Sequence, residues 1–394
     1  MKDLDPLPPT PDFDVWPVTH TITAAAVRDG DVAVSWSDGR SCVYNRFLLA
    51  ENDPAPEVIH PLSREMIPSP LEFPADLAAT GARVLPNGAL QVEWSHGRPG
   101  SVYHPGWLRA HAWFGEDAGA AEPVLWRAEE QPEPPTFSGP EALEDRAVFL
   151  GWLRALRDHG VARLEGLPQQ DGLLEEIVRR IGVIRETNFG RSYTLEIKDD
   201  PDSNAYTSHA LPLHMDLGTR ECPPGLQFLY CRENTTSGGE GLYADAYRIG
   251  EDLRREEPEV FRDLTTIDWV FNNRAKTSSY KAAGPILDLD AAGQIRAVRY
   301  TTWLRAPMIA PPDVQDRAYR AVRAFAARAA DPRYMMVVRY RPGDLFAFDN
   351  RRALHGRRAY DARGGARFIE GVYSDRDELH SAIRVLEREM PEAG

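Results

Sequence analysis

Two stretches near the start of the chain alternate apolar and polar residues, at positions 32–40 and 90–98. A period of two residues is typical of a strand with one buried face. Each stretch ends in a polar-glycine turn, so each is predicted to open a β-hairpin. We therefore interpret residues 1–113 as a small β-rich N-terminal domain.

The spacing changes after residues 114–140, a Glu-, Pro- and Ala-rich stretch that we interpret as a linker. Beyond it, apolar residues recur every three to four positions, which is the period of an α-helix. The predicted amphipathic helices cover residues 149–156, 173–181, 252–264 and 316–330. Two short runs, residues 159–164 and 345–348, are predicted strands. Residues 141–394 are thus predicted to form a second domain, mainly β with flanking helices.

Composition narrows the class of protein. The 394 residues carry a formal net charge of −14, which disfavours a polyanionic partner such as nucleic acid. No apolar run approaches the roughly 18 residues needed to span a bilayer, and the N-terminus has no signal pattern. The three cysteines are too few and too scattered for a disulfide framework. We expect a soluble cytoplasmic protein that binds neither nucleic acid nor membrane.

The candidate chemistry lies in the second domain. His214 and Asp216 stand two residues apart, and His355 follows far downstream at the end of the predicted strand. Two histidines and one carboxylate are the ligand set of a facial iron site, and residues two apart on a strand project to the same face. Arg367 comes twelve residues after His355, and its guanidinium could bind the distal carboxylate of a dicarboxylate co-substrate.

Several motifs resemble those of the γ-butyrobetaine and trimethyllysine dioxygenases, within the taurine dioxygenase-like group of Fe(II)/2-oxoglutarate oxygenases. These motifs lie at residues 205–207, 213–216, 223–227, 238–240, 348–352, 355–360 and 370–375. The resemblance implies a double-stranded β-helix (jelly-roll) catalytic domain. It also implies iron held by His214, Asp216 and His355, with 2-oxoglutarate bound through Arg367 and O2 as the second co-substrate.

The resemblance extends to the N-terminal domain, which in γ-butyrobetaine dioxygenases commonly holds a structural zinc on a cluster of cysteines with a histidine. This chain has only Cys42 in that region, and one thiolate cannot build a tetrahedral site. We expect no zinc there. The domain is predicted to be held together by Trp36, Trp94 and Trp107. Its expected role is either to mediate homodimerisation or to cover the active site.

Four aromatic residues fall where the family pattern places a cage for a trimethylammonium group: Phe189, Tyr193, Tyr206 and Tyr373. The negative ring faces can surround a cation that is too bulky to hydrogen-bond. We therefore expect a small-molecule substrate that carries a trimethylammonium group.

The residues expected to bind the anionic end of the substrate match the family less closely, because the family uses asparagine amides at these positions. The corresponding positions are Ser203, with Asn204 adjacent, and Thr301, and two arginines and a further threonine (Arg299, Arg305 and Thr302) lie nearby in sequence. A phosphonate would suit hydroxyls with an arginine. A second departure is Gly241, where related enzymes often carry a Ser or Thr near 2-oxoglutarate.

Four interpretations follow and stay open at this point. The first is hydroxylation of an unactivated C–H bond in a γ-butyrobetaine-like zwitterion. The second is the same chemistry on 2-trimethylaminoethylphosphonate or trimethyllysine. The third is a different oxygenase outcome, such as desaturation, or a biosynthetic oxygenase acting on a non-quaternary substrate. The fourth is a non-catalytic binding protein, against which the intact ligand set argues.

Overall fold

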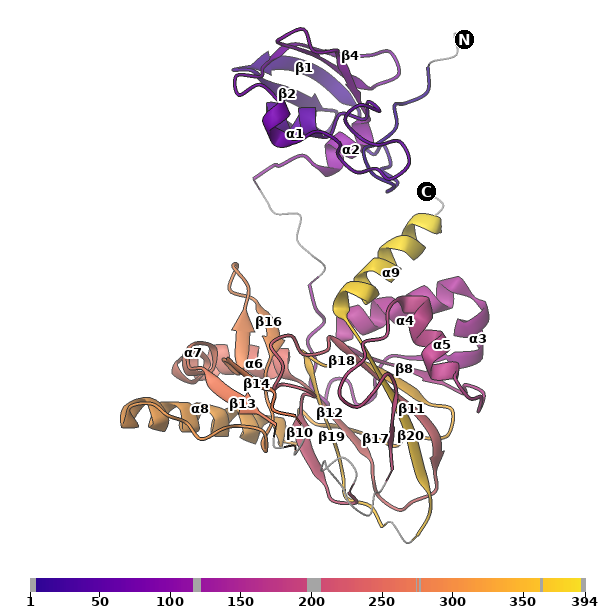
Figure 1. Ribbon diagram of the computed structural model, residues 1–394, viewed down its shortest axis with the longest axis vertical. Helices are drawn as coiled ribbons and strands as arrows, with labels where there is room; N and C mark the ends of the chain where they lie inside the picture. The colour runs from indigo at the N-terminus through magenta and orange to yellow at the C-terminus, as the bar shows by residue number, and fades with distance from the viewer. Residues whose placement is uncertain are drawn as a thin grey trace. The chain divides into compact units, whose positions relative to one another are not determined.

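The computed structural model describes residues 5–115, 122–196, 207–273, 275, 278–361 and 364–390. These residues fall into two compact units on either side of the boundary between residues 120 and 121 (Figure 1). Each unit has its own hydrophobic core.

The N-terminal unit is built from two similar repeats, each a three-stranded antiparallel sheet followed by a short helix. The first repeat consists of β1 (Ile22–Arg28), β2 (Asp31–Trp36), β3 (Ser41–Tyr44) and α1 (Arg46–Glu51). The second consists of β4 (Ala79–Val84), β5 (Leu90–Trp94), β6 (Ser101–Tyr103) and α2 (Pro105–Ala110), and a 3-10 turn (Pro70–Glu72) lies between the repeats. Both hairpins expected from the alternating stretches are present, as β2–β3 and β5–β6.

The two repeats are linked by a pair of equivalent hydrogen bonds. Tyr44, which ends β3, donates to the Leu108 carbonyl of the other repeat's helix at 2.6 Å. Tyr103, which ends β6, donates to the Leu49 carbonyl at 2.7 Å. The same core contains Trp36, Trp94 and Trp107, all at most 5% exposed. A buried tyrosine needs a partner for its hydroxyl, so this reciprocal pair fixes how the two repeats pack.

Cys42 lies in this apolar core and is 6% exposed. Because a tetrahedral zinc site needs several thiolate or imidazole ligands, we predict no stoichiometric zinc in the N-terminal unit. Elemental analysis of purified protein should therefore give the same zinc content for the wild type and for Cys42→Ser. One equivalent of zinc that disappears in the variant would contradict the prediction.

The second unit contains two main sheets among its described residues. The strands of the six-stranded sheet are, in hydrogen-bonded order, β7 (Thr136–Ser138), β8 (Val161–Glu165), β18 (Leu345–Asp349), β11 (Leu226–Asn234), β20 (Arg367–Ser374) and β9 (Tyr193–Leu195). Those of the four-stranded sheet are β10 (Leu211–His214), β19 (Ala353–Arg357), β12 (Gly241–Asp245) and β17 (Met336–Val338). Two hairpins accompany them, β13 (Trp269–Asn272) with β14 (Lys281–Gly284), and β15 (Leu287–Leu289) with β16 (Ile295–Val298).

Helices cover the outer side of each main sheet (Figure 1). Those against the six-stranded sheet are α3 (Gly139–Glu144), α4 (Arg146–His159), α5 (Leu173–Ile181) and α9 (Arg376–Glu389). Those against the four-stranded sheet are α6 (Ala246–Glu256), α7 (Pro258–Thr266) and α8 (Pro312–Ala329).

Alternation along the strands separates these layers. In β18, Leu345 and Ala347 face the helices, whereas Phe346 and Phe348 face the space between the two sheets. Both faces are buried, because successive side chains of a strand point to opposite faces and each face meets another layer. The interior between the sheets is the part of the unit that can enclose a site.

Two predictions need correction or refinement. The single helix expected over residues 252–264 is wrong, because the chain forms α6 and α7 with a break at Glu257. Pro258 is the first residue of α7, and a residue before proline is disfavoured in the helical conformation. Part of the expected linker is also built into the second unit, where the Trp126 side chain is 2% exposed and its Nε1 donates to the His159 carbonyl at 2.8 Å.

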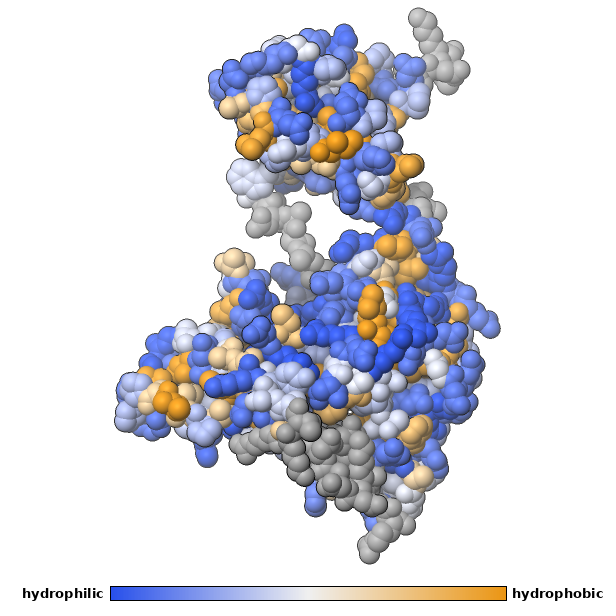
Figure 2. Space-filling model, in the orientation of Figure 1, coloured by the Kyte–Doolittle hydropathy of each residue, from blue (hydrophilic) through white to orange (hydrophobic). Residues whose placement is uncertain are grey.

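On the face of the molecule that Figure 2 shows, the coloured residues are mostly hydrophilic, with hydrophobic side chains in small groups. Single exposed apolar residues such as Leu71 and Ile309 are ordinary on protein surfaces. None of the helices described here combines the length and apolarity that crossing a bilayer requires.

Candidate active site

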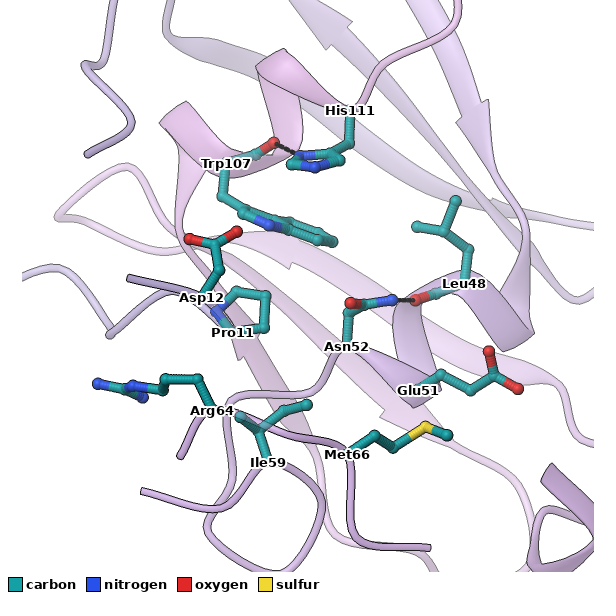
Figure 3. A pocket seen from close by; sticks show the side chains of 10 residues that line it. All are labelled: Pro11, Asp12, Leu48, Glu51, Asn52, Ile59, Arg64, Met66, Trp107 and His111. Atoms are coloured by element: carbon teal, nitrogen blue, oxygen red, sulfur yellow. Dashed lines mark hydrogen bonds between the residues drawn. The ribbon is translucent and has the colours of Figure 1, made fainter. Parts of the chain in front are cut away.

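Size alone does not single out the functional cavity. A cavity of about 470 Å³ lies within the N-terminal unit, lined by Pro11, Asp12, Leu48, Glu51, Asn52, Ile59, Arg64, Met66, Trp107 and His111 (Figure 3). There the His111 ring contacts the Trp107 carbonyl at 2.8 Å, and Asn52 donates to the Leu48 carbonyl at 2.9 Å. Two smaller cavities in the second unit, about 100 and 60 Å³, share two side chains with metal-ligand chemistry, His214 and Asp216. The chemistry therefore points to the second unit.

His214, Asp216 and His355 come together there. Their ligand atoms lie within 4.8 Å of one another, which makes them the one group of this kind found among the described residues. His214 Nε2 is 3.3 Å and His355 Nε2 is 3.7 Å from Asp216 Oδ1. Ligands at about 2.1 Å from one ion, arranged on one face, are separated by about these distances. The donor set fits a divalent iron-type ion, and leaves the opposite face open for other ligands.

Sheet pairing places the two histidines. His214 ends β10 and lies directly opposite His355 on β19, with their ring centroids 4.3 Å apart. His214 Nδ1 is 2.8 Å from the Pro212 carbonyl, so Nδ1 carries the proton and the Nε2 lone pair is left available for a metal. The His355 ring packs on Phe348 at 4.8 Å.

Asp216 is placed differently from our expectation. β10 ends at His214, so Asp216 is not on the same strand face, and the residue after it, Leu217, has a φ of 54°. Asn350 fixes this turn by accepting from the Asp216 backbone N–H at 2.8 Å and donating to the Asp216 carbonyl at 3.0 Å. The two residues do lie close together, but it is the hydrogen bonds between Asn350 and the Asp216 backbone, and not a shared strand face, that position Asp216.

The electrostatics keep the ligands ready for a metal. Enclosure would raise the pKa of Asp216, but the adjacent His355 and His214 and a hydrogen bond from Tyr373 hold it well below its usual range. Burial, reinforced by His214, lowers the pKa of His355 to about 3. The carboxylate is therefore ionised and His355 is neutral at pH 7, which are the states that bind metal.

One of the two cavities, here called the aromatic cavity, is lined by Phe189, Tyr193, Leu195, Leu211, His214, Met215, Asp216, Leu217, Thr301, Trp303, Leu304 and Tyr373. The rings of Tyr193 and Tyr373 stack at 5.1 Å, and Phe189 lies 6.3 Å from Tyr193. Tyr373 also donates to Asp216 Oδ2 at 2.6 Å, which leaves Oδ1 toward the histidines. Three of the four predicted cage residues thus share one cavity with two of the candidate metal ligands, His214 and Asp216.

The remaining predicted substrate residues divide into two groups. Tyr206, Ser203 and Asn204 lie outside the described residues. Thr301 lines the aromatic cavity, is 1% exposed, and has an Oγ1 with no hydrogen-bond partner in the described part of the chain. A buried hydroxyl without a partner is uncommon in proteins and suits a ligand atom.

The arginines near Thr301 do not reach this cavity. Arg299 donates to three backbone carbonyls, those of Gly218, Arg220 and Glu221. Arg305 packs over the Trp269 ring, 4.8 Å from its centroid. Neither lines the aromatic cavity, whose described lining contains no lysine or arginine.

The second cavity, here called the arginine cavity, is lined by Leu195, Leu211, His214, Asp216, Gln227, Leu229, Gly241, Tyr243, Tyr340, His355, Gly356, Arg357 and Arg367. Arg367 Nε and Nη1 are buried and have no hydrogen-bond partner among the residues described. Burial lowers the pKa of the Arg367 guanidinium, although arginine stays charged at neutral pH. An unpaired buried cation beside the metal ligands fits an anionic co-substrate.

Sequence reasoning missed several members of this site. Trp303 packs on His214, with ring centroids 4.6 Å apart, and lines the aromatic cavity. Gln227 donates to the Tyr193 hydroxyl at 2.7 Å. Asn350 lies within one of the family motifs, but nothing in its spacing indicates its role. Tyr243 and Tyr340 also line the arginine cavity. These residues come from separate strands and loops, so only tertiary contacts bring them together.

Comparison with known proteins places this geometry in context. The family model described as taurine catabolism dioxygenase TauD, TfdA family matches residues 121–373. A γ-butyrobetaine dioxygenase from Pseudomonas sp. (strain AK-1) is 37% identical over 380 residues, covering 96% of this chain and 99% of that protein. Human γ-butyrobetaine dioxygenase is 28% identical over 65% of this chain and 67% of its own length.

Two further proteins are similar at lower identity or coverage. The mitochondrial trimethyllysine dioxygenase of Bos taurus is 28% identical, covering 72% of this chain and 69% of that protein. A solved structure of asparagine oxygenase in complex with Fe(II), 2S,3S-3-hydroxyasparagine and succinate has a TM-score of 0.48 at 18% identity. It covers 58% of this chain and 79% of the other.

Proposed function

The chain belongs to the taurine catabolism dioxygenase TauD, TfdA family, and from that membership we propose that it hydroxylates a small trimethylammonium carboxylate of the γ-butyrobetaine type. It is an Fe(II)- and 2-oxoglutarate-dependent dioxygenase. When bound, iron with 2-oxoglutarate and O2 would supply the oxidation of a C–H bond to C–OH, while 2-oxoglutarate is decarboxylated to succinate and CO2. The residues of the chain would bind and orient the metal, the co-substrate and the substrate, and would exclude water from the site.

We assign His214, Asp216 and His355 as the metal ligands and Arg367 as the residue that binds 2-oxoglutarate. The two main sheets with their enclosed site are consistent with a double-stranded β-helix, the arrangement that we propose for residues 141–394. The N-terminal residues 1–113 would form a separate domain. We also propose that the protein is cytoplasmic and forms a homodimer.

The observation that carries the substrate assignment is the aromatic wall beside the candidate metal ligands His214 and Asp216. Phe189, Tyr193 and Tyr373 line the cavity that also contains Asp216. Ring faces attract a desolvated quaternary ammonium, with a contribution of about 0.5–2 kcal/mol per contact. A trimethylammonium head in this cavity would lie close to the metal, so that a C–H bond a short distance along the substrate faces it.

The lining of the aromatic cavity favours a carboxylate over a phosphonate. Its described residues include the neutral hydroxyl of Thr301 but no cationic side chain. A phosphonate carries more charge than a carboxylate and would need an arginine, yet Arg299 is bound to backbone carbonyls. A monoanion is the better match.

Trimethyllysine is the weaker second candidate, although its dioxygenases are among the similar proteins. Its α-ammonium group would need an acceptor, and Asp216 is the one carboxylate in the described lining of the aromatic cavity. Asp216 is already assigned to the metal. A non-quaternary substrate would leave the aromatic wall without a role, and hydroxylation is preferred to desaturation on the likeness to the γ-butyrobetaine dioxygenases.

Succinate release across a substrate panel tests the proposal. We expect γ-butyrobetaine to stimulate release more than trimethyllysine and 2-trimethylaminoethylphosphonate do. A larger response to the phosphonate would change the assigned anionic group from a carboxylate to a phosphonate. Stimulation by none of the three would contradict the trimethylammonium assignment, while substrate-independent conversion of 2-oxoglutarate would still support the enzyme class.

Phe189 offers the cleanest test of the aromatic wall, because no side-chain hydrogen bond is involved. Phe189→Leu keeps apolar bulk but removes the ring, so we expect γ-butyrobetaine binding to weaken by about 1 kcal/mol, or roughly fivefold. Affinity for the isostere 5,5-dimethylhexanoate, in which carbon replaces nitrogen so that the head group is uncharged, should change much less.

Tyr193→Phe is the matched control for this measurement, because it keeps the ring and removes only the hydroxyl that accepts from Gln227. We expect it to retain the preference of the wild type for the cation over the isostere. Equal losses for both ligands in Phe189→Leu would show that Phe189 contributes packing and no cation recognition.

A further inference from the structure

Gly241 stands where related enzymes often carry a hydroxyl, and the structure shows what occupies that space. A Cβ added to Gly241 would lie 2.5 Å from Tyr340 Cε2, closer than carbon atoms approach. The ring of Tyr340 therefore fills the room that a side chain at position 241 would take. Tyr340 comes from the segment between β17 and β18, and Gly241 begins β12.

Tyr340 forms a buried pair with Tyr243. Their hydroxyls are hydrogen-bonded to each other, and the residues are 3% and 1% exposed. Each phenol has one O–H, and the mutual bond uses one of the two. The second O–H is therefore left over to donate to another group. Burial raises the pKa of both phenols, although the Arg367 charge lowers it in part, so both stay protonated at neutral pH.

The pair lines the same cavity as His355 and Arg367. Tyr243 on β12 is the cross-strand partner of His355 on β19, and residues paired in this way point to the same face. Tyr243, Tyr340 and Arg367 all line the arginine cavity. Beside them, the Arg367 guanidinium lies 5.4 Å from the Tyr360 ring centroid, while its Nε and Nη1 have no hydrogen-bond partner among the described residues.

We propose that the Tyr243–Tyr340 hydroxyl pair binds the distal carboxylate of 2-oxoglutarate together with Arg367, replacing the hydroxyl that Gly241 cannot supply. This inference rests on the proposed function, because it requires that the arginine cavity takes 2-oxoglutarate. Arg367 contributes charge and a two-pronged contact, and the pair contributes one neutral donor whose direction is fixed by the partner phenol. A carboxylate held at two such points is oriented as well as neutralised.

Equilibrium binding separates this role from activity. Calorimetric titration of 2-oxoglutarate into protein loaded with Mn(II), which avoids turnover, should show affinity about tenfold or more weaker for Tyr340→Phe than for the wild type, the usual size of a hydrogen bond to a charged group. Tyr243→Phe should weaken binding similarly, since either loss removes the spare donor or releases its orientation. Tyr230→Phe is the matched control, because it loses a buried tyrosine bond to the Pro168 carbonyl outside the site.

A co-substrate analogue identifies the contact. 2-Oxopentanoate has a methyl group in place of the distal carboxylate, so its affinity should be the same in Tyr340→Phe and in the wild type. Equal weakening for both ligands would show a general disturbance of the cavity and would overturn the proposal. Unchanged 2-oxoglutarate affinity in both phenylalanine variants would overturn it as well.

A rescue variant tests directly whether Tyr340 takes the place of a hydroxyl-bearing side chain at position 241. Tyr340→Ala should lose 2-oxoglutarate affinity, and adding Gly241→Ser should restore part of it, because the serine then has both room and a hydroxyl. No recovery in a folded double variant would argue against the exchange. If wild-type protein bound 2-oxopentanoate and 2-oxoglutarate equally, the assignment of the arginine cavity to 2-oxoglutarate would fail. That outcome differs from an unchanged 2-oxoglutarate affinity in Tyr340→Phe, which would contradict only the role of the tyrosine pair.

Discussion

Replacing either metal-binding histidine should reduce succinate release to the background of protein without iron. His214→Ala and His355→Ala each leave two ligands, and Nε2 of each histidine lies within 4 Å of Asp216 Oδ1 in the intact site. Two ligands hold a labile divalent ion far more weakly than three, and the facial arrangement that leaves the opposite face open is lost. Iron content after desalting, measured together with succinate, checks both parts of the expectation.

The fold should survive these changes. His214 and His355 each contribute one small side chain at the edge of a cavity, while the large hydrophobic clusters on both sides of the sheets are untouched. Circular dichroism and thermal unfolding should therefore match the wild type closely. His159→Ala is a useful control, because that histidine contacts Gln131 away from the metal site and its loss should leave iron content and turnover intact. A His355→Ala enzyme with full iron and full activity would show that the ligand assignment is wrong.

The local features of the fold follow closely from sequence pattern. The hairpins of the N-terminal unit are predictable because alternation and a glycine turn are encoded within ten residues. The helix expected over residues 252–264 is wrong for an equally local reason, since the hydrophobic period runs through Pro258 while the proline ends the preceding helix.

The candidate ligand set could be proposed from the sequence for a different reason. Two histidines and an aspartate with this spacing match the needs of one metal site, and family motifs surround all three. The position of Asp216 is not predictable, because the asparagine that clamps its backbone lies 134 residues away in sequence. The same holds for Tyr340, whose ring accounts for Gly241 only once the two segments are placed side by side. Contacts between distant segments carry no periodic signal.

Replacing Arg367 by lysine should weaken 2-oxoglutarate binding by about a hundredfold, even though the formal charge is kept. The guanidinium offers a rigid fork whose Nε and Nη1 have no protein partner among the described residues, whereas an ammonium offers a single point. Losing a charge-assisted bond costs about 1.5–3 kcal/mol, which is roughly ten- to a hundredfold in affinity. Calorimetric titration of the Mn(II)-loaded protein measures the effect without turnover.

Burial adds a second penalty that gives this variant a distinctive pH dependence. Burial already lowers the pKa of Arg367, and a lysine in the same place starts from a lower pKa of about 10.4. The lysine charge is present below its depressed pKa and lost above it, so 2-oxoglutarate affinity of Arg367→Lys should fall as pH rises toward about 9, while the wild type changes little. Arg232→Lys, which alters an arginine paired with Asp171 and Glu370, should show neither effect. Wild-type affinity for 2-oxoglutarate in Arg367→Lys across this pH range would mean that another residue binds the distal carboxylate.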